Sequence, residues 1–176
     1  TGTGCVVANG NILKKVYFPR EIIPISITTS QLINFLITMI IVFIFIIFSG
    51  VGFSVHVLLL PLLILIQYII TLGFNFILSA ITVFVRDVDH FVSVVMMLAF
   101  YATPVIYKAD MLPEKFQWVL KINPMAQLIE GYRSILYYHT LPDMMMILLW
   151  GLLSVVILVI GYLIFKKLEK SFVEEL

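Results

Sequence analysis

The stretch Arg86-Asp87-Val88-Asp89-His90 holds the side chains best suited to chemistry. Because carboxylates prefer hard cations, Asp87 and Asp89 could bind Mg²⁺, as an integral-membrane glycosyl or phospho-transferase would require. No second acidic cluster shares this predicted loop. The alternative is a junction between two helices, in which Asp89 caps the second helix. Metal-dependent activity would separate the two interpretations.

Other familiar chemical motifs do not occur in the 176 residues. The single cysteine, Cys5, excludes a disulfide framework and a cysteine-based metal site. The three histidines lie far apart and lack metal-ligand spacing: His56, His90 and His139. No GxxxxGK[ST] pattern is present, so these residues form no ATP-binding P-loop. We therefore expect neither a catalytic residue nor a metal site.

Polar side chains recur every three or four residues along the uncharged segment 57–85. They are Gln67, Thr71, Asn75, Ser79 and Thr82, and segment 27–49 repeats the pattern more weakly with Gln31, Asn34 and Thr38. This spacing places each set on one helical face. The side chains either line a polar pathway, with Gln67, Thr71 and Asn75 as the candidates, or join neighbouring helices by hydrogen bonds.

The composition explains why these helices are expected in a membrane. Hydrophobic residues make up 62% of the chain and charged residues 12%, against about 45–50% and about 25% in soluble domains. The net charge is only +1, so no strong field attracts an acidic polymer. These values exclude a soluble enzyme, a disordered tail and a nucleic-acid-binding module, and they favour a lipid bilayer as the solvent.

Long uncharged runs predict the fold class, an all-α transmembrane helix bundle. A helix needs about 20 residues to cross the hydrocarbon core, and segments 27–49, 57–85 and 144–165 meet that length. Segment 91–105 is shorter and ends near Pro104, so it is either a tilted span or a re-entrant piece. No repeat or linker indicates a second domain.

The charges between these runs predict the orientation. With four crossings, segments 14–24, 86–90 and 166–176 share one face of the membrane and carry the denser set of basic residues. Basic loops remain in the cytoplasm. We therefore expect the C-terminus in the cytoplasm and segment 106–141 outside.

The outer segment is too long for a plain connection, and it predicts two short amphipathic helices within 112–140. Asn123-Pro124 would cap the second, where Glu130 and Arg133 can pair. Aromatic residues crowd this end: Tyr101, Tyr107, Trp118, Tyr132, Tyr137 and Tyr138. They form either an ordinary interfacial belt or stacking surfaces for sugar rings near an exit.

A set of short motifs in a fixed order gives a family resemblance. They are Lys14-Lys15-Val16-Tyr17-Phe18-Pro19-Arg20-Glu21-Ile22-Ile23-Pro24, Phe84-Val85-Arg86-Asp87-Val88, Thr103-Pro104-Val105-Ile106-Tyr107, Asn123-Pro124 and Phe165-Lys166-Lys167-Leu168-Glu169. Each motif alone is weak. Together they resemble the permease subunits of type-2 ABC exporters, in the branch that exports O-antigen, teichoic acid and related lipid-linked polysaccharides.

The resemblance implies six spans, of which this chain would hold the last four. The chain begins with Thr1 rather than Met, and we interpret it as a fragment in which residues 1–13 end the second span. The alternative is a mature chain with a flexible Gly/Thr tail. Segment 112–140 would form two outer re-entrant helices, and 14–24 would be a cytoplasmic coupling segment. From the residues alone, 14–24 is either a short interfacial helix or turn that docks a cytosolic partner, or a positively charged anchor.

The resemblance also implies the partners. A separate ABC ATPase subunit would bind ATP and Mg²⁺, two permeases would pair with two ATPases, and this chain would bind no cofactor. The substrate would be a polyprenyl-diphosphate-linked glycan that crosses the bacterial cytoplasmic membrane, with its lipid tail in the bilayer. The implied coupling residues are Lys14, Lys15, Phe18, Pro19, Arg20 and Glu21. The implied substrate path adds Tyr101, Tyr107, Trp118 and Tyr132 to the polar stripe.

A second exporter class would share this fold. An ABC exporter of small lipophilic compounds or drugs would differ in its substrate and its outer helices. Both exporter classes fit the absence of charge near the span centres, because ion-coupled carriers usually keep an ionisable residue there. The energy for transport is therefore expected from a partner.

Overall fold

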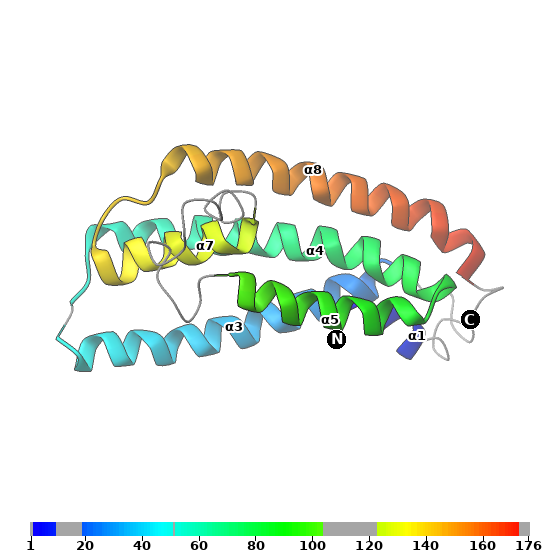
Figure 1. Cartoon of the computed structure of the whole chain (residues 1–176), viewed down its shortest axis with the longest axis horizontal. Coiled ribbons are helices and arrows are strands. Elements are labelled where there is room, and N and C mark those ends of the chain that lie inside the picture. The colour runs from blue at the N-terminus through cyan, green and yellow to red at the C-terminus, as the bar shows by residue number, and fades with distance from the viewer. Residues whose placement is uncertain (1, 10–18, 51, 104–122, 173–176) are drawn as a thin grey trace. The chain divides into compact units, whose positions relative to one another are not determined.

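The computed structural model describes residues 2–9, 19–50, 52–103 and 123–172, and every regular element among them is a helix. Figure 1 shows the elements in chain order. They are α1 (Cys5–Ala8), α3 (Ile22–Phe48), η1 (Val55–Leu59), α4 (Leu60–Phe84), α5 (Asp87–Ala102), α7 (Pro124–Arg133), the π-helical η4 (Ser134–Tyr138), α8 (Met144–Leu168) and η5 (Glu169–Ser171).

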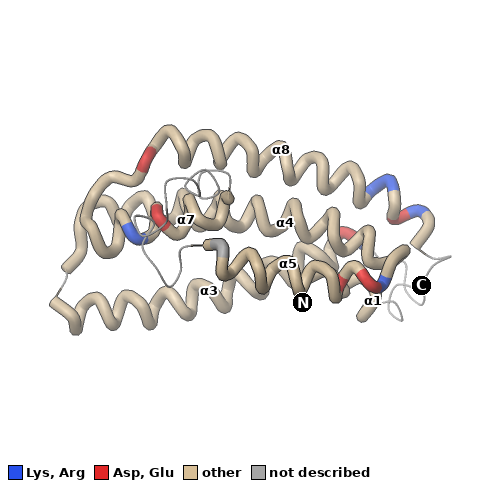
Figure 2. The backbone as a smooth tube through the Cα atoms, viewed as in Figure 1, with Lys and Arg blue, Asp and Glu red and all other residues tan. Residues whose placement is uncertain are grey.

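Three stretches among the described residues are long and apolar enough to cross a membrane: Ile22–Phe48, Val55–Phe84 and Met144–Ser171. They correspond to the predicted spans 27–49, 57–85 and 144–165. The prediction of an all-helical fold is therefore confirmed. Figure 2 shows the described charged residues near helix ends and in connections, where charges avoid the cost of burial in hydrocarbon.

The helix ends follow local rules, with some shifts from the predicted bounds. α3 begins at Ile22 rather than at 27, because Pro24 is tolerated in a first turn that needs no intrahelical donor. After α3, Gly50 and Gly52 adopt φ values of +70° and +80°. Only glycine enters that region without strain, so the chain turns there.

The helix α5 differs more from the expected segment 91–105. It begins at Asp87, directly after a turn at Arg86, so Asp87 and Asp89 lie in its first turn rather than in a loop. Acidic residues are favourable there because they face the positive end of the helix dipole. The 16 residues of α5 correspond to a length of about 24 Å, which is less than the hydrocarbon core of about 30 Å.

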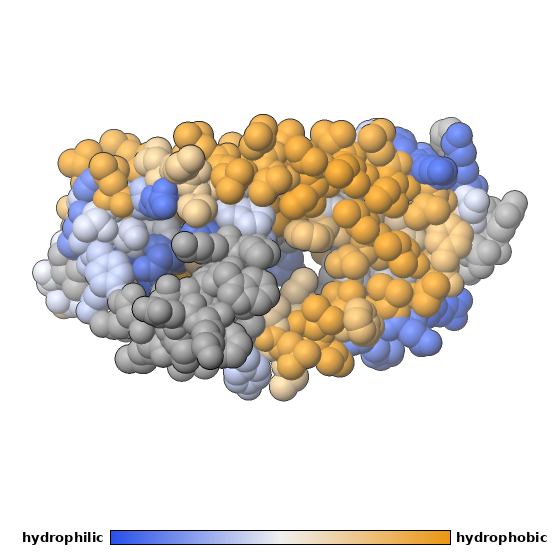
Figure 3. Space-filling model, turned by 45° about the horizontal axis from the view of Figure 1, so that its top comes forward, coloured by the Kyte–Doolittle hydropathy of each residue, from blue (hydrophilic) through white to orange (hydrophobic). Residues whose placement is uncertain are grey.

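The helices group into two compact units. Unit 1 comprises Thr1–Leu36, Tyr68–Val94 and Leu153–Leu176, and unit 2 comprises Ile37–Gln67 and Val95–Leu152. Each of α3, α4, α5 and α8 contributes residues to both units. For unit 1, Figure 3 shows apolar side chains along the helices and hydrophilic ones at the end where α8 finishes.

The core of unit 1 contains a cluster of aromatic rings among aliphatic side chains. Phe165 contacts Phe76 with ring centroids 5.3 Å apart and Phe172 with centroids 5.5 Å apart. Both Phe165 and Phe172 are fully buried. Beside them α4 and α8 approach closely, since a Cβ atom on Gly161 would lie 2.4 Å from the Gly73 backbone oxygen. Small residues permit such contacts between membrane helices.

The core of unit 2 joins α4 to α7 and the start of α8. Leu63, Leu128, Ile135 and Ile147 are buried there. The Asn123 side chain accepts a hydrogen bond from the Met125 amide over 3.0 Å and so caps α7, which confirms the cap predicted at Asn123-Pro124. The first of the two predicted outer helices falls within 104–122, outside the described residues.

Candidate functional site

The described part of the predicted coupling segment contacts the end of α8 in unit 1. Lys14, Lys15 and Phe18 lie outside the described residues, and Pro19 is exposed. Lys166 Nζ donates to Glu21 Oε2 over 2.8 Å and to Glu169 Oε1 over 3.0 Å. One ammonium group therefore bridges carboxylates from two distant parts of the chain.

Arg20 reinforces the same contact. Its guanidinium donates to the backbone oxygen of Glu169 and lies 6.0 Å from the centre of the Phe172 ring. A cation above an aromatic face is attracted by the ring quadrupole. We call Arg20, Glu21, Lys166, Glu169 and Phe172 the clamp, since together they hold the start of α3 against the end of α8.

The charges of the clamp change the pKa of Glu21, which precedes the first turn of α3. The hydrogen bond from Lys166 holds the pKa of this carboxyl below its ordinary value of 4.5. The ionised form is therefore favoured. The clamp has the chemistry of a charge-dependent attachment rather than of a catalytic site.

The charged residues at the start of α5 do not join the clamp through any described contact. Arg86 and Asp87 are exposed, and half-buried Asp89 accepts a hydrogen bond from the Thr3 hydroxyl. Among the described residues, no group of three or more His, Cys, Asp or Glu side chains could hold a metal ion. The described contacts of Asp89 are those of a tether between the N-terminal residues and α5.

The predicted polar stripe separates into residues with different surroundings. Thr71 is exposed, whereas Asn75 is only 7% exposed. Asn75 Nδ2 donates to Thr28 Oγ1 over 2.8 Å and to the Pro24 backbone oxygen over 3.2 Å. Ser79 and Thr82 are buried and donate to backbone oxygens of their own helix. The two hydrogen bonds of Asn75 join α4 to the first turns of α3.

Gln67 belongs to unit 2, where the Tyr132 hydroxyl donates to its side-chain oxygen over 2.8 Å. The structure therefore brings together two of the predicted substrate-path residues, one from α4 and one from α7. Tyr101 is exposed near the end of α5, with its ring against Phe100. Tyr107 and Trp118 lie outside the described residues.

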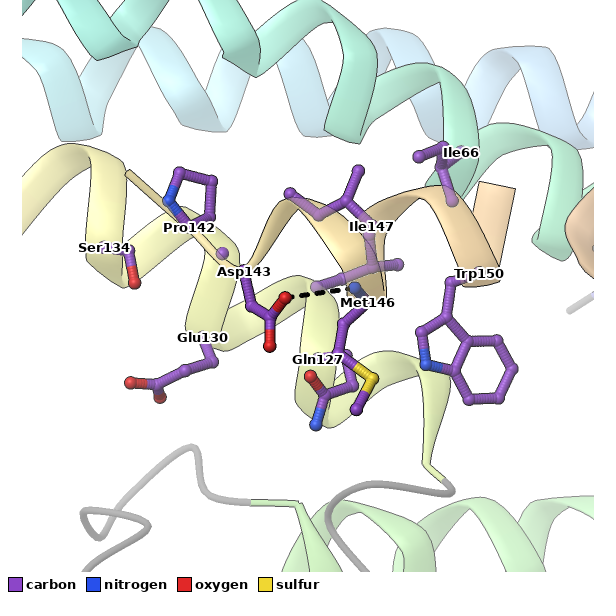
Figure 4. A pocket seen from close by; sticks show the side chains of 11 residues that line it. Ile66, Gln127, Glu130, Ser134, Pro142, Asp143, Met146, Ile147 and Trp150 are labelled. Atoms are coloured by element: carbon purple, nitrogen blue, oxygen red, sulfur yellow. Dashed lines mark hydrogen bonds between the residues drawn. The ribbon is translucent and has the colours of Figure 1, made fainter. Parts of the chain in front are cut away.

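A recess of about 50 Å³ lies in unit 2 between α7, η4 and the start of α8. Figure 4 shows its polar side chains: Gln127, Glu130, Ser134, Asp143 and Trp150. Sequence reasoning did not select this group. The spacing of Gln127, Glu130 and Ser134 indicates a shared helical face, but Trp150 comes from another helix, so no local pattern connects it to them.

The predicted pair between Glu130 and Arg133 is confirmed, although its oxygen and nitrogen are 3.8 Å apart. On another side of α7, an apolar groove of about 520 Å³ runs along the second half of α3. Phe45 and Leu136 contribute to its walls, with Tyr132 and Arg133 among the polar residues that line it. The groove offers an apolar surface next to a guanidinium and a tyrosine hydroxyl.

These features define a multi-pass helical membrane protein with charges near its helix ends. A model of the family described as "ABC-2 type transporter" matches residues 5–137. The chain therefore belongs to the ABC-2 type transporter family.

Three curated relatives carry the description "O-antigen export system permease protein RfbA". Two from Klebsiella pneumoniae are 37% and 35% identical over 169 residues, which is 96% of this chain and 65% of each relative. One from Myxococcus xanthus is 33% identical over 177 residues, covering 99% of this chain and 68% of the relative. The chain thus spans about two thirds of the length of these relatives.

Proposed function

We propose that this chain is the permease portion of an ATP-driven exporter that moves a lipid-linked polysaccharide of the O-antigen type across the bacterial cytoplasmic membrane. The observation that carries the proposal is the similarity to O-antigen export permeases over 96% of the chain. The lack of charge near the span centres is compatible with it, because ion-coupled carriers usually keep an ionisable residue there. The proposed partner is a separate ABC ATPase subunit, which binds ATP and Mg²⁺.

The membrane arrangement follows from the charge pattern. The clamp lies at the cytoplasmic face together with the C-terminus, and α7 lies near the outer face. α5 forms a fourth, short span, and α7 is one of the outer helices. A second permease copy completes the transport path.

The clamp supports a role in coupling. The proposed coupling residues are Lys14, Lys15, Phe18, Pro19, Arg20 and Glu21, which contact the ATPase. Glu21 is hydrogen-bonded to Lys166 of α8, and the Pro24 backbone oxygen is hydrogen-bonded to Asn75 of α4. A displacement of the coupling segment would therefore act directly on two spans.

The substrate requires hydroxyl partners and flat apolar faces rather than fixed charge. Tyr132 and Gln67 provide a hydroxyl and an amide, and Thr71, Tyr101, Tyr107 and Trp118 remain proposed path residues. Asn75 is instead engaged with Pro24 and Thr28. The apolar groove beside α3 supports passage of the lipid tail along the bilayer. The diphosphate would meet few acidic groups there.

The test is deletion of the gene from its host, followed by complementation with the complete gene. We expect surface polysaccharide to disappear and its lipid-linked precursor to accumulate in the inner leaflet. The complete gene should restore export, but not in a strain whose partner ATPase lacks its P-loop lysine. Unchanged surface polysaccharide combined with increased sensitivity to lipophilic compounds would instead establish the drug-exporter alternative.

A further inference from the structure

The recess between α7, η4 and α8 contains a donor without a partner. The Nε1 atom of Trp150 is buried and has no hydrogen-bond acceptor within the part of the chain that the structure describes. A buried donor left unpaired costs about 1–3 kcal/mol, and such a group calls for an explanation in its surroundings. A ligand oxygen in the recess would supply the missing acceptor.

The other polar side chains of the recess provide both donors and acceptors. Gln127 carries an amide, Ser134 a hydroxyl, and Glu130 and Asp143 carboxylates. Asp143 is held in place because its Oδ1 accepts hydrogen bonds from the backbone amides of Met145 and Met146, over 3.0 and 3.2 Å. Figure 4 shows the bond from Met146. A sugar hydroxyl can donate to a carboxylate while it accepts from an N–H group.

The charges of the recess select among ligands. Two carboxylates line it, so a phosphate group entering it would meet like charge. The diphosphate of a lipid carrier is therefore disfavoured, whereas a neutral hydroxyl-bearing group is not. Arg133, which pairs with Glu130, is absent from the lining.

The size of the recess sets how much of a sugar it can take. A water molecule needs about 10–15 Å³ of comparable space, so a recess of about 50 Å³ accepts a hydroxyl or hydroxymethyl group with a few waters. A whole sugar ring would remain outside, with its apolar face free to contact the Trp150 indole. Trp150 lies about two turns into α8, near the end that we place outside.

We propose that this recess binds the hydroxyl-bearing edge of a neutral sugar of the exported glycan, with Trp150 as donor and stacking surface. The inference rests on the proposed export function and adds a binding site to it. The principal acceptors are Glu130 and Asp143, and the amide of Gln127 orients the same hydroxyl group. The site would retain a sugar as it leaves the transport path.

The test uses the complete permease with its ATPase in lipid nanodiscs, labelled with 5-fluorotryptophan. The ¹⁹F resonance that disappears in Trp150→Phe reports the site. The probe is the host's own surface polysaccharide released from its lipid. We expect this resonance to shift on titration, and Gln127→Leu to weaken the apparent affinity about fivefold, the effect of one neutral hydrogen bond.

Export in cells provides the second measurement. At matched permease levels, Trp150→Phe should reduce surface polysaccharide and Trp150→Leu should reduce it further, because the second change also removes the ring. Leu149→Ala, at an exposed neighbour on α8, is the matched control and should export normally. Thermal melting of each variant shows whether it is folded.

The outcomes separate this inference from the proposed function. If gene deletion abolishes surface polysaccharide but the Trp150 resonance does not shift and the Trp150 variants export normally, the recess is not a sugar site and the export function stands. A shift produced by a lipophilic cation such as tetraphenylphosphonium, and not by the polysaccharide, would also overturn the inference. Loss of export in folded Trp150 variants together with the resonance shift would establish it.

Discussion

Asn75 in α4 donates its side-chain amide to the backbone oxygen of Pro24, 51 residues earlier in the sequence, over 3.2 Å. The same amide donates to Thr28 Oγ1, and the Thr28 hydroxyl donates in turn to the Pro24 oxygen, each over 2.8 Å. Three polar groups therefore close a small buried network at the first turns of α3. This network fixes the position of α3 along α4, next to the segment that we propose to contact the ATPase.

We expect Asn75→Leu to lower the stability of the permease by about 1 kcal/mol, the typical net value of such hydrogen bonds. Thr28→Val should cost a similar amount, and the double variant less than the sum, because the two side chains share one interaction. The measurement is unfolding in detergent. Phe74→Leu, at an exposed neighbour, serves as the control, and strict additivity of the two changes would contradict the network.

The clamp predicts a charge-exchange experiment. Glu21→Lys alone places two ammonium groups together, and Lys166→Glu alone places three carboxylates together, so each should lower the melting temperature. The exchanged pair, Glu21→Lys with Lys166→Glu, should recover part of the loss. Equal melting temperatures for all four proteins would show that the Glu21–Lys166 contact contributes nothing to stability.

Charge reversal at Arg20 and Glu21 also tests coupling. Docking of the ATPase depends on charge complementarity, so the double reversal should weaken copurification of the ATPase while membrane insertion is unchanged. The exchanged pair described above separates docking from the clamp, because it alters the docking charge but keeps an ion pair to α8. Normal copurification and normal transport-coupled hydrolysis in the reversal would leave segment 14–24 as an anchor only.

The lowered pKa of Glu21 predicts how the clamp responds to acid. Because the folded-state pKa lies below the ordinary value of 4.5, the ionised carboxylate stabilises the fold at and above that pH. The contribution is lost as the pH falls through the lowered pKa. The melting temperature of Glu21→Gln should therefore be below that of the parent at pH 7, and the difference should vanish in strong acid. If the difference in melting temperature persists unchanged in strong acid, the effect of Glu21→Gln comes from packing and not from the charge.

The contact between α4 and α8 predicts a large difference between two glycines. A Cβ atom on Gly161 would lie 2.4 Å from the Gly73 backbone oxygen, whereas one on Gly151 would lie 3.5 Å from a carbon of the Ile66 side chain. Gly161→Ala should therefore destabilise the protein by about 1–3 kcal/mol, as overpacked cores do. Gly151→Ala should be tolerated, and equal melting temperatures for the two variants would contradict the close approach.

The proposed orientation can be measured by cysteine labelling in a complete permease without Cys5. A cysteine at Lys170, which is exposed, should react with a membrane-impermeant reagent only after the membrane is opened. A cysteine at position 115, within the proposed outer segment, should react in intact spheroplasts. Labelling of position 115 from the inside alone would reverse the topology.

The aromatic residues of the proposed path predict a separation of transport from folding. Replacing Tyr101, Tyr107 and Trp118 together by Leu keeps apolar bulk but removes the flat rings and the hydroxyl groups. We expect expression and membrane insertion to survive and surface polysaccharide to fall. Normal surface polysaccharide at matched permease levels would show that these residues form only an ordinary interfacial belt.

The sequence by itself determined the features that depend on neighbouring residues. The long apolar runs predicted the three candidate spans, because hydrocarbon tolerates few charges. The Asn123-Pro124 pair predicted the start of α7, since a cap requires only local groups. Local rules placed some boundaries less well: the uncharged run was predicted from residue 27, whereas α3 begins at Ile22, since a proline in a first turn costs little.

Only the tertiary structure decided which distant side chains meet. The polar stripe was visible in the sequence, but its spacing could not distinguish a pathway from a joint, and packing places Asn75 against Pro24 and Thr28. Glu21 and Lys166 are 145 residues apart, and Trp150 reaches the α7 recess from another helix. Such meetings depend on how the helices cross and rotate, which the summed packing of many side chains determines and no local pattern encodes.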